Sequence, residues 1–484
     1  MMLLYIDLFC GAGGTSSGVN SARLNGKQCA TVIACVNHDK NAIASHIANH
    51  PKAMHFTEDI RTLELSPLKA HIESCRCQYP DALLVLWASL ECTNFSKAKG
   101  GMPRDADSRS LAEHLFRYIE VLNPDYIQVE NVEEFMSWGE VDKNGKPISM
   151  DKGKSYLCWV RNVKKYGYNF DYRILNSADY GAYTSRKRFF GIFAKQGLPI
   201  TFPEATHCKE GWTSLFGSLK KWRPVYECLD LSDDGNSIFA RKKPLVEATL
   251  NRIYAGLIKF VAGGKEAFIV KYNSVNKKTG KYVPPSIDEP CPTVATQNRL
   301  GVAKVSFLSK QFSGEPYGKN KSVDEPAGTI TTIDHHAFVS AYYGNGHKYS
   351  SVDKPCFARM DKMPPYLVAA ETGEIAIEVY DTDSPTTVKI KEFMALYGII
   401  DIKMRMLKIS ELKKIMGFPE DYVLVGTQTE QRKYIGNAVE VTIARSWCEA
   451  LCAKLKDYQY GRSNIIALQN SKASTPKQTN LFND

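Results

Sequence analysis

The sequence lacks any apolar run of the length that a membrane-spanning helix needs, about 18 residues. Its first residues, "MMLLYIDLFCGAGG", are apolar, but they lack the basic segment and the small-residue cleavage site of a secretory signal peptide. We therefore expect neither a membrane span nor export, and we predict that the protein is cytoplasmic.

Metal-binding cysteine patterns are also missing. The 13 cysteines are scattered, and only "CRC" (Cys75 and Cys77) forms a close pair. No set has the paired spacing of a zinc site. We interpret the cysteines as reduced thiols, mostly structural, and predict no metal.

The composition present is that of an ordinary globular protein. Of the 484 residues 44% are hydrophobic and 24% are charged, and this length is enough for two or three domains. Lys and Arg number 62 against 52 Asp and Glu, a formal charge of +10. This moderately basic balance favours a polyanionic partner.

Residues 1–202 alternate strand and helix patterns. Apolar runs such as "ATVIACV" and "ALLVLWA" are followed by amphipathic stretches such as "SLAEHLFRYIEVL". This rhythm predicts an α/β fold with a doubly wound, mostly parallel sheet. Ligands of such sheets bind at the carboxyl ends of the strands. There we find Gly11–Gly14, Asn37–Asp39, Glu91 with Cys92, and Glu130 with Asn131.

Residues 203–401 differ in composition from residues 1–202 and are richer in Pro, Gly, Lys and Tyr. An Asp-x-Pro pattern recurs, with prolines at Pro290, Pro326, Pro355 and Pro385, and a β-branched segment follows each. We predict a smaller, strand-rich domain of related units, with chance reuse of a turn as the alternative. Residues 402–460 are again helical, and the polar residues 461–484 are predicted to be a disordered tail.

The glycine turn "DLFCGAGGTSSG" predicts a cofactor loop. No Lys-Ser/Thr follows the glycines, which excludes a loop that binds nucleoside triphosphates. Asp7 and Phe9 suit an ammonium group and an adenine better than a pyrophosphate. Polar groups at Asn37 and His38, and the pair Asp59 and Ile60, favour S-adenosylmethionine over NAD. The alternative is that each acid caps a helix.

Cys92 lies where the strand "LLVLWAS" gives way to a polar loop, directly after Glu91. A neighbouring carboxylate raises a thiol's pKa, which disfavours a nucleophile. By itself, Cys92 therefore fits a buried structural cysteine better than a catalytic one.

Taken together, the motifs resemble those of the cytosine-5 DNA methyltransferases. The resemblance rests on "DLFCGAGG", the Cys92 loop, "ENV" at residues 130–132, "DYGAYTSRKRFFGI" at 179–192, "GFPEDY" at 417–422 and "IGNAV" at 435–439. It implies a catalytic and cofactor-binding domain at 1–202, a target-recognition domain at 203–401, and helices at 402–460 that return to the catalytic domain.

The resemblance also implies residue roles. A cysteine adds to C6 of a flipped-out cytosine, and C5 then accepts the methyl group of S-adenosylmethionine. Glu130 would act at N3 and Arg186, with Arg188 beside it, at O2. The implied catalytic residues are Cys92, Glu130, Asn131, Arg186 and Arg188. The predicted cofactor site comprises Asp7, Phe9, Gly11, Gly13, Gly14, Asn37, His38, Asp59, Ile60, Glu91, Leu111, Asn437 and Ala438.

The chain departs from the family pattern near these residues. Glu91 replaces the proline before the cysteine, Thr184 replaces a glutamine, and Glu440 replaces a common proline. The alternatives are therefore a catalytically inactive DNA-binding relative, or C5 modification of an unusual substrate or with a variant cofactor. RNA is a further alternative substrate.

The expected partner is double-stranded DNA, with "FARKKP" (239–244) and "NSVNKKTGKY" (273–282) as candidate phosphate contacts. Gln478–Phe482 resembles the Gln-x-x-Leu-Phe peptide that docks on the bacterial sliding clamp. We also predict a bacterial or phage origin, association with the nucleoid, and a cognate restriction nuclease as a candidate partner.

Overall fold

A computed structural model describes most of the chain. The described residues are 2–90, 111–139, 148–149, 152–215, 217–262, 267–272, 282–297, 299–310, 336–338, 366–369, 376–397 and 399–473. They form two compact units, the first containing residues 1–223, 292–297 and 412–484, and the second 224–291 and 298–411. In the described part of the chain, no helix is both long and apolar enough to cross a membrane.

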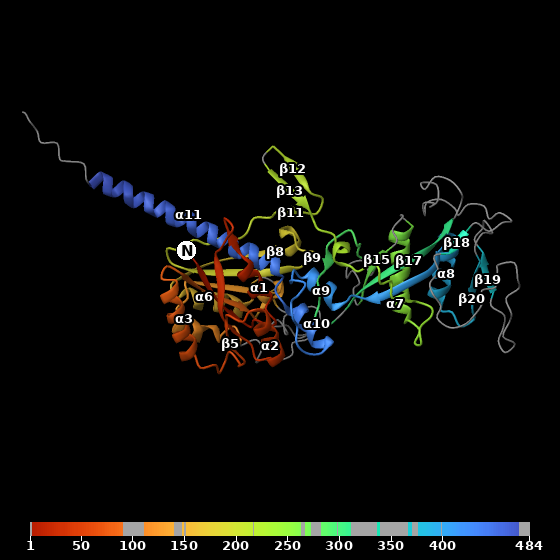
Figure 1. The fold of residues 1–484 in the computed structure, drawn as a ribbon, viewed down its shortest axis with the longest axis horizontal. Helices are drawn as coiled ribbons and strands as arrows, with labels where there is room; N and C mark the ends of the chain where they lie inside the picture. Colours follow the sequence, from red (N-terminus) through yellow and green to blue (C-terminus); the bar gives the residue numbers. More distant parts are fainter. Residues whose placement is uncertain are drawn as a thin grey trace, which may run out of the picture. The chain divides into compact units, whose positions relative to one another are not determined.

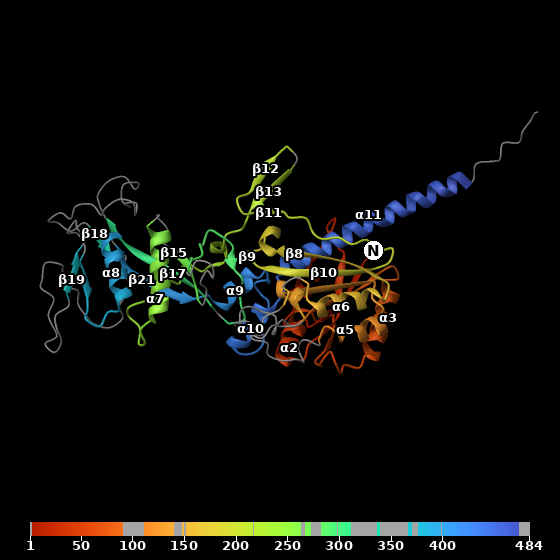
Figure 2. The ribbon, with the colours of Figure 1, turned by 180° about the vertical axis from the view of Figure 1, so that it is seen from behind.

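The first unit is built on a seven-stranded sheet (Figures 1 and 2). Its strand order is β5 (Met54–Phe56), β4 (Ala30–Val36), β1 (Leu3–Leu8), β6 (Leu83–Ser89), β7 (Tyr126–Asn131), β10 (Lys187–Lys195) and β8 (Tyr168–Asn176). The pairs from β5 to β7 are parallel, and β10 runs antiparallel to both of its neighbours. The predicted mostly parallel, doubly wound α/β sheet is confirmed.

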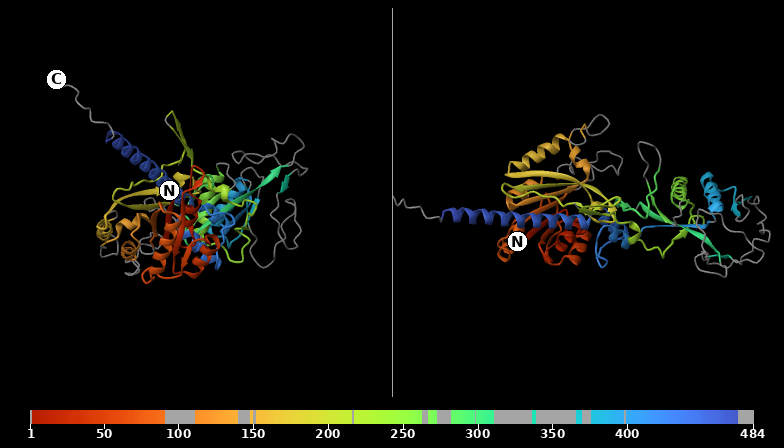
Figure 3. Two further views of the ribbon diagram at one scale, coloured as in Figure 1. Left: turned by 60° about the vertical axis from the view of Figure 1, so that its left-hand side comes forward. Right: turned by 90° about the horizontal axis from the view of Figure 1, so that it is seen from above.

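Alternating side chains of β1 supply a core on each face of this sheet. Leu4, Ile6 and Leu8 pack with α3 (Ser66–Gln78), α5 (Leu115–Leu122) and α6 (Lys154–Lys164). Leu3 and Tyr5 point to the other face, where α1 (Gly14–Ser21) and α11 (Val441–Ala473) pack. Figure 3 shows the first part of α11, in blue, lying along the sheet.

The remaining described elements of the first unit are short. They are β2 (Arg23–Leu24), β3 (Lys27–Gln28), α2 (Lys40–Asn49), β9 (Thr184–Ser185), β11 (His207–Cys208), β12 (Trp212–Ser214), β13 (Gly217–Lys221), α10 (Gln428–Asn437) and the 3-10 helices η2 (Glu133–Ser137) and η3 (Ser177–Tyr180). The helix α9 (Ile409–Ile415) crosses from the second unit into the first.

The second unit contains a five-stranded antiparallel sheet and two helices. The strands are β14 (Asn236–Ser237), β15 (Ala267–Lys271), β17 (Leu300–Lys310), β18 (His336–Phe338) and β21 (Ile399–Met406). The helices α7 (Glu247–Gly256) and α8 (Pro385–Tyr397) contribute to its apolar core. A hairpin of β19 (Tyr366–Ala369) and β20 (Ala376–Val379) and the short β16 (Cys291–Pro292) complete the described strands.

Two details differ from the sequence-based predictions. Pro385, expected to start a strand-like repeat, is the first residue of α8, and Ser384 Oγ accepts the backbone N–H of Thr387. A capping serine before a proline starts a helix because proline lacks the N–H that a first helical turn leaves unpaired. In addition, α11 continues to Ala473, past Gly461, where we expected the disordered tail to begin. Pro326 and Pro355 lie outside the described residues.

Candidate active site

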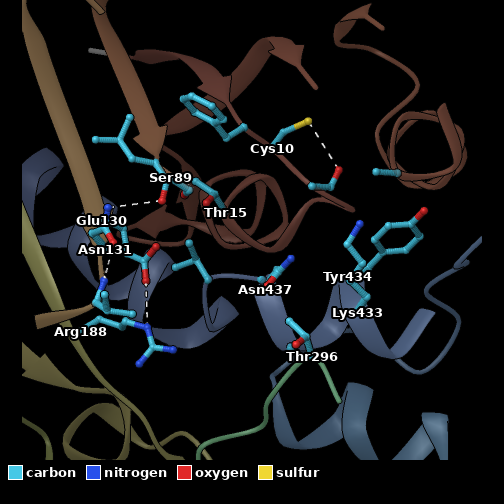
Figure 4. A pocket seen from close by; sticks show the side chains of 18 of the residues that line it. Cys10, Thr15, Ser89, Glu130, Asn131, Arg188, Thr296, Lys433, Tyr434 and Asn437 are labelled. Atoms are coloured by element: carbon cyan, nitrogen blue, oxygen red, sulfur yellow. Dashed lines mark hydrogen bonds and ion pairs between the residues drawn. The ribbon is translucent and has the colours of Figure 1, made fainter. Parts of the chain in front are cut away.

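A pocket of about 500 Å³ lies in the first unit at the carboxyl ends of its parallel strands (Figure 4). Ten of the predicted site residues line it, namely Phe9, Gly11, Asn37, His38, Glu130, Asn131, Arg186, Arg188, Asn437 and Ala438. Convergence of the strand-end loops on one crevice is therefore observed for the described residues. Glu91 and Cys92 lie outside those residues.

The glycines of the loop have two different roles: one lines the pocket, and the others allow close packing of the chain. Gly11 has φ +52°, and a Cβ added there would meet no atom within 4 Å, so this backbone borders open space. A Cβ on Gly13 would lie 2.4 Å from Tyr422 Oη, and one on Gly14 would lie 2.4 Å from the Val439 carbonyl oxygen. Gly13 and Gly14 therefore allow the C-terminal segment to pack closely and do not line the pocket.

The loop after β4 presents Asn37 and His38 to the pocket. Asn37 Oδ1 accepts the Asp39 backbone N–H at 2.9 Å, which fixes the amide at the rim. The Asp39 carboxylate caps α2 through the N–H groups of Asn41 and Ala42. For Asp39, the alternative interpretation as a helix cap is therefore confirmed.

Other predicted cofactor residues lie outside the described pocket lining. The Asp59 carboxylate is paired with Arg61 at 2.6 Å, which lowers its pKa. Ile60 and Leu111 belong to the apolar core under the sheet. Asp7 is fully buried, and burial raises its pKa to about 8 although Ser16 Oγ donates to it at 2.7 Å.

Glu130, at the end of β7, is the buried acid of the pocket. Its Oε1 lies 3.5 Å from Arg188 Nε, and Figure 4 shows the two side chains facing each other. Burial raises the Glu130 pKa, while the positive charges of Arg188 and Arg186 oppose that shift. Burial thus favours the protonated form of this carboxyl group, which is the form that can donate a proton.

Arg186 is buried and bound to the backbone. Its Nη1 donates to the Val294 carbonyl at 3.3 Å, and its Nη2 donates to Gly436 at 3.3 Å and Ala438 at 3.0 Å. The sequence predicts Arg186 as the cation that acts at O2 of the base. In the structure, the hydrogen bonds of Arg186 join two segments that border the pocket, and its role at O2 stays a prediction.

Asn131 stabilises the strand end that leads to Cys92. Its Nδ2 donates to the Leu90 carbonyl at 3.3 Å, and its Oδ1 accepts the Val132 backbone N–H at 2.8 Å. Leu90 is the last described residue before the Cys92 loop. The amide therefore links the end of β7 to the end of β6.

Sequence reasoning missed two groups of lining residues. Residues 293–296 come from the middle of the chain, where Thr293 Oγ1 donates to the Ser185 carbonyl at 3.0 Å. They fall inside the stretch that we assigned to another domain, and no motif marks them. Lys433 and Tyr434 also line the pocket. Their position just before "IGNAV" is a signal that could have identified them.

Comparison with known proteins gives a family match over most of the chain. The model of the family described as C-5 cytosine-specific DNA methylase matches residues 3–453. The Type II methyltransferase M.AgeI of Thalassovita gelatinovora is 28% identical over 203 residues, 42% of this chain and 42% of that protein. M1.HphI of Haemophilus parahaemolyticus is 28% identical over 209 residues, 43% of this chain and 50% of the relative.

The chain thus spans about half the length of the curated relatives that it matches. Among solved structures, the Entamoeba histolytica methyltransferase EhMeth is 15% identical, with a TM-score of 0.45, over 94% of this chain and 99% of that one. This identity and this TM-score are too low to indicate an activity.

Proposed function

Because the chain belongs to the C-5 cytosine-specific DNA methylase family, we propose that it methylates C5 of cytosine in double-stranded DNA, with S-adenosylmethionine as the methyl donor. One observation carries the proposal. The pocket that contains the open Gly11 backbone and Asn37 also contains the buried Glu130–Arg188 pair.

The residues present fit the cofactor. Gly11 borders open space where any side chain would intrude, and Phe9 offers an aromatic ring at the same edge. The amides of Asn37 and Asn437 are suited to ribose hydroxyls and to the amino-acid end of the molecule. Bound S-adenosylmethionine supplies the methyl group.

The roles of the protein's side chains follow from their chemistry. Cys92 adds to C6 of a cytosine swung out of the duplex, which makes C5 nucleophilic. Glu130 donates a hydrogen bond or a proton to N3, which its raised pKa favours. A base then removes the C5 proton, the sulfur leaves, and the ring becomes aromatic again.

We assign the cation at O2 to Arg188, in a change from the sequence-based prediction. Arg188 lies beside Glu130, whereas the guanidinium of Arg186 donates to three backbone carbonyls. Asn131 positions Leu90 and thereby the strand end that precedes Cys92.

Trapping on modified DNA tests the assignment of Cys92. Duplex DNA with 5-fluorocytosine at the target site should form a stable adduct with the protein and S-adenosylmethionine, because fluorine does not leave as a proton does. Cys92→Ser should abolish the adduct, and Cys75→Ser, which changes a half-buried thiol on α3, should retain it. An adduct with Cys92→Ser would show that the nucleophile is wrongly assigned.

The second unit is our candidate for the target-recognition domain that the sequence places at 203–401, and its basic loop at 239–244 is a candidate phosphate contact. A nuclease partner and a place at the bacterial nucleoid are consistent with this role. Transfer of tritiated methyl groups to mixed-sequence duplex DNA, with single-stranded DNA and RNA as competitors, would identify the substrate.

Gln478–Phe482, outside the described residues, is our candidate clamp-binding peptide. Two adjacent apolar side chains would fill a pocket while the glutamine amide bonds at its rim. A peptide of residues 472–484 should bind a bacterial sliding clamp with micromolar affinity, and Leu481→Ala with Phe482→Ala should remove that binding. Absence of binding by the unchanged peptide would refute the assignment.

A further inference from the structure

A second group of reactive side chains lies under the glycine loop and takes no part in the proposed reaction. The sulfur atoms of Cys10 and Cys35 and a ring nitrogen of His46 all lie within 4.8 Å of one another. The three residues are buried, and Cys10, labelled in Figure 4, also borders the pocket. They come from the end of β1, from β4 and from α2.

A fourth donor faces this group from β5. His46 Nδ1 lies 3.5 Å from Cys35 Sγ and 2.9 Å from His55 Nε2. Donors from four different segments therefore meet here: Cys10, Cys35 and His46 have ligand atoms within 4.8 Å of one another, and His55 adjoins them through its contact with His46. The sequence did not predict this, because the residues are 9 to 25 positions apart and have no short paired spacing.

Hydrogen bonds behind His46 determine which of its nitrogens faces the group. Ser16 Oγ donates to Asp7 Oδ2 at 2.7 Å, so its proton is already in use. His46 Nε2 lies 2.8 Å from Ser16 Oγ. Nδ1 is therefore the ring nitrogen that faces Cys35 and His55. Metal-binding histidines are oriented in this way, with the second ring nitrogen bonded to an outer group.

Two of the spacings can be compared with those around a tetrahedral metal ion. Zinc lies about 2.3 Å from sulfur and about 2.0 Å from nitrogen, so a tetrahedral site separates S and N by about 3.5 Å and two nitrogens by about 3.3 Å. The Cys35–His46 distance of 3.5 Å agrees, and the His46–His55 distance of 2.9 Å is short by only a few tenths of an ångström. Two thiolates would also balance the two charges of the ion inside this buried region.

We propose that Cys10, Cys35, His46 and His55 bind one zinc ion as a structural site. Four protein ligands leave no open position for a substrate, so this site stabilises the fold and has no catalytic role. The ion would join the ends of three parallel strands and α2 directly beside Gly11. It would thereby hold the backbone of the loop that forms one wall of the pocket.

Metal content tests the proposal. Full-length protein purified without chelators from zinc-supplemented cells should contain about one zinc per chain by mass spectrometry, and Cys35→Ser should contain less than about a tenth of that. Cys448→Ser is the matched control, because Cys29, Cys448 and Cys452 form a separate group of buried thiols. That variant should keep its zinc. Zinc retained by Cys35→Ser, or absent from the unchanged protein, would overturn the proposal.

Cobalt substitution gives a readout that does not depend on the folding of a variant. The unchanged protein, stripped of zinc and loaded with Co²⁺, should show the visible bands of a tetrahedral ion and near-ultraviolet charge transfer from two thiolates. Charge transfer from three thiolates would place the ion at Cys29, Cys448 and Cys452 and refute the proposed site. No tetrahedral spectrum would refute it as well.

Discussion

Arg186 and Arg188 are separated by one residue, Arg186 directly before β10 and Arg188 within it, yet their surroundings differ. The Arg186 guanidinium is buried and donates to carbonyls of Val294, Gly436 and Ala438. Arg188 is less buried and faces the carboxylate of Glu130. The same residue type therefore holds the backbone at one position and faces a buried carboxylate at the other.

Substitutions should separate these two roles. Arg186→Ala leaves buried carbonyls without donors and should lower the free energy of unfolding by at least about 2 kcal/mol. Arg188→Ala should change it by only about 1 kcal/mol, because Glu130 can take up a proton when its cation is removed. It should nevertheless slow methyl transfer by about 10²-fold or more. Urea unfolding and single-turnover methylation measure the two effects.

The opposite pattern, in which Arg188→Ala unfolds the protein and Arg186→Ala only slows it, would show that the roles are exchanged. Arg173→Ala is the control, since this exposed arginine forms an ion pair with Asp171 away from the pocket.

Among the helices, α11 has an unusual start. Glu440 directly precedes it and is almost fully buried, and its carboxylate accepts the backbone N–H groups of Thr442 and Ile443, both at 2.9 Å. Burial raises the pKa of Glu440 to about 7, and the two hydrogen bonds only partly oppose this. The residue that departs from the family's proline is thus a helix cap.

This cap should make stability depend on pH. The folded pKa of about 7 lies above the ordinary 4.5, so the folded state binds the proton more tightly than the unfolded state does. The resulting stabilisation is full below pH 4.5 and is lost as the pH rises through 7. Glu440→Gln removes the titration, so its free energy of unfolding should rise relative to the unchanged protein by up to about 3 kcal/mol between pH 5 and pH 8.

Urea unfolding at several pH values measures this difference. Glu73→Gln, on the exposed side of α3, serves as the control and should follow the unchanged protein at each pH. If Glu440→Gln also runs parallel to the unchanged protein, then Glu440 does not titrate in this range.

At the scale of elements, the sequence predicted the sheet and the strand-end residues well. Buried runs such as "LLVLWAS" in β6 are easily recognised, and the groups at Gly11, Asn37 and Glu130 follow from where parallel strands end. Residues 293–296 could not be predicted, since they reach the pocket from a distant part of the chain without a local pattern. Serine directly before proline at Ser384–Pro385 is a local helix-start signal, and in the structure it overrides the Asp-x-Pro pattern.

For the whole molecule, α11 supplies a large part of the apolar core on the sheet face to which Leu3 and Tyr5 point. Trp447 is completely buried, lies edge-on to Trp87 and Phe190 with ring centroids 5.4 Å away in each case, and donates its Nε1–H to the Thr201 carbonyl at 2.9 Å. The strands that it covers come from the first 200 residues. The core is therefore complete only when distant parts of the sequence meet.

Removing this indole should be costly. Trp447→Ala creates a large cavity and should lower the free energy of unfolding by about 3–5 kcal/mol. Trp212→Ala, at an exposed position in β12, should change it by less than about 0.5 kcal/mol. Thermal and urea denaturation give both values. Similar losses for the two variants would show that α11 does not anchor the core.

The late position of α11 also has a consequence during synthesis. A ribosome adds roughly 5–20 residues each second, so tens of seconds separate the emergence of β1 from that of α11. Until α11 emerges, the sheet face that carries Leu3, Tyr5 and Trp87 lacks the part of its cover that α11 supplies. The nascent chain would therefore expose an apolar sheet face for long enough to need a chaperone, and its yield in cells should depend on chaperone supply more than on the stability of the finished fold.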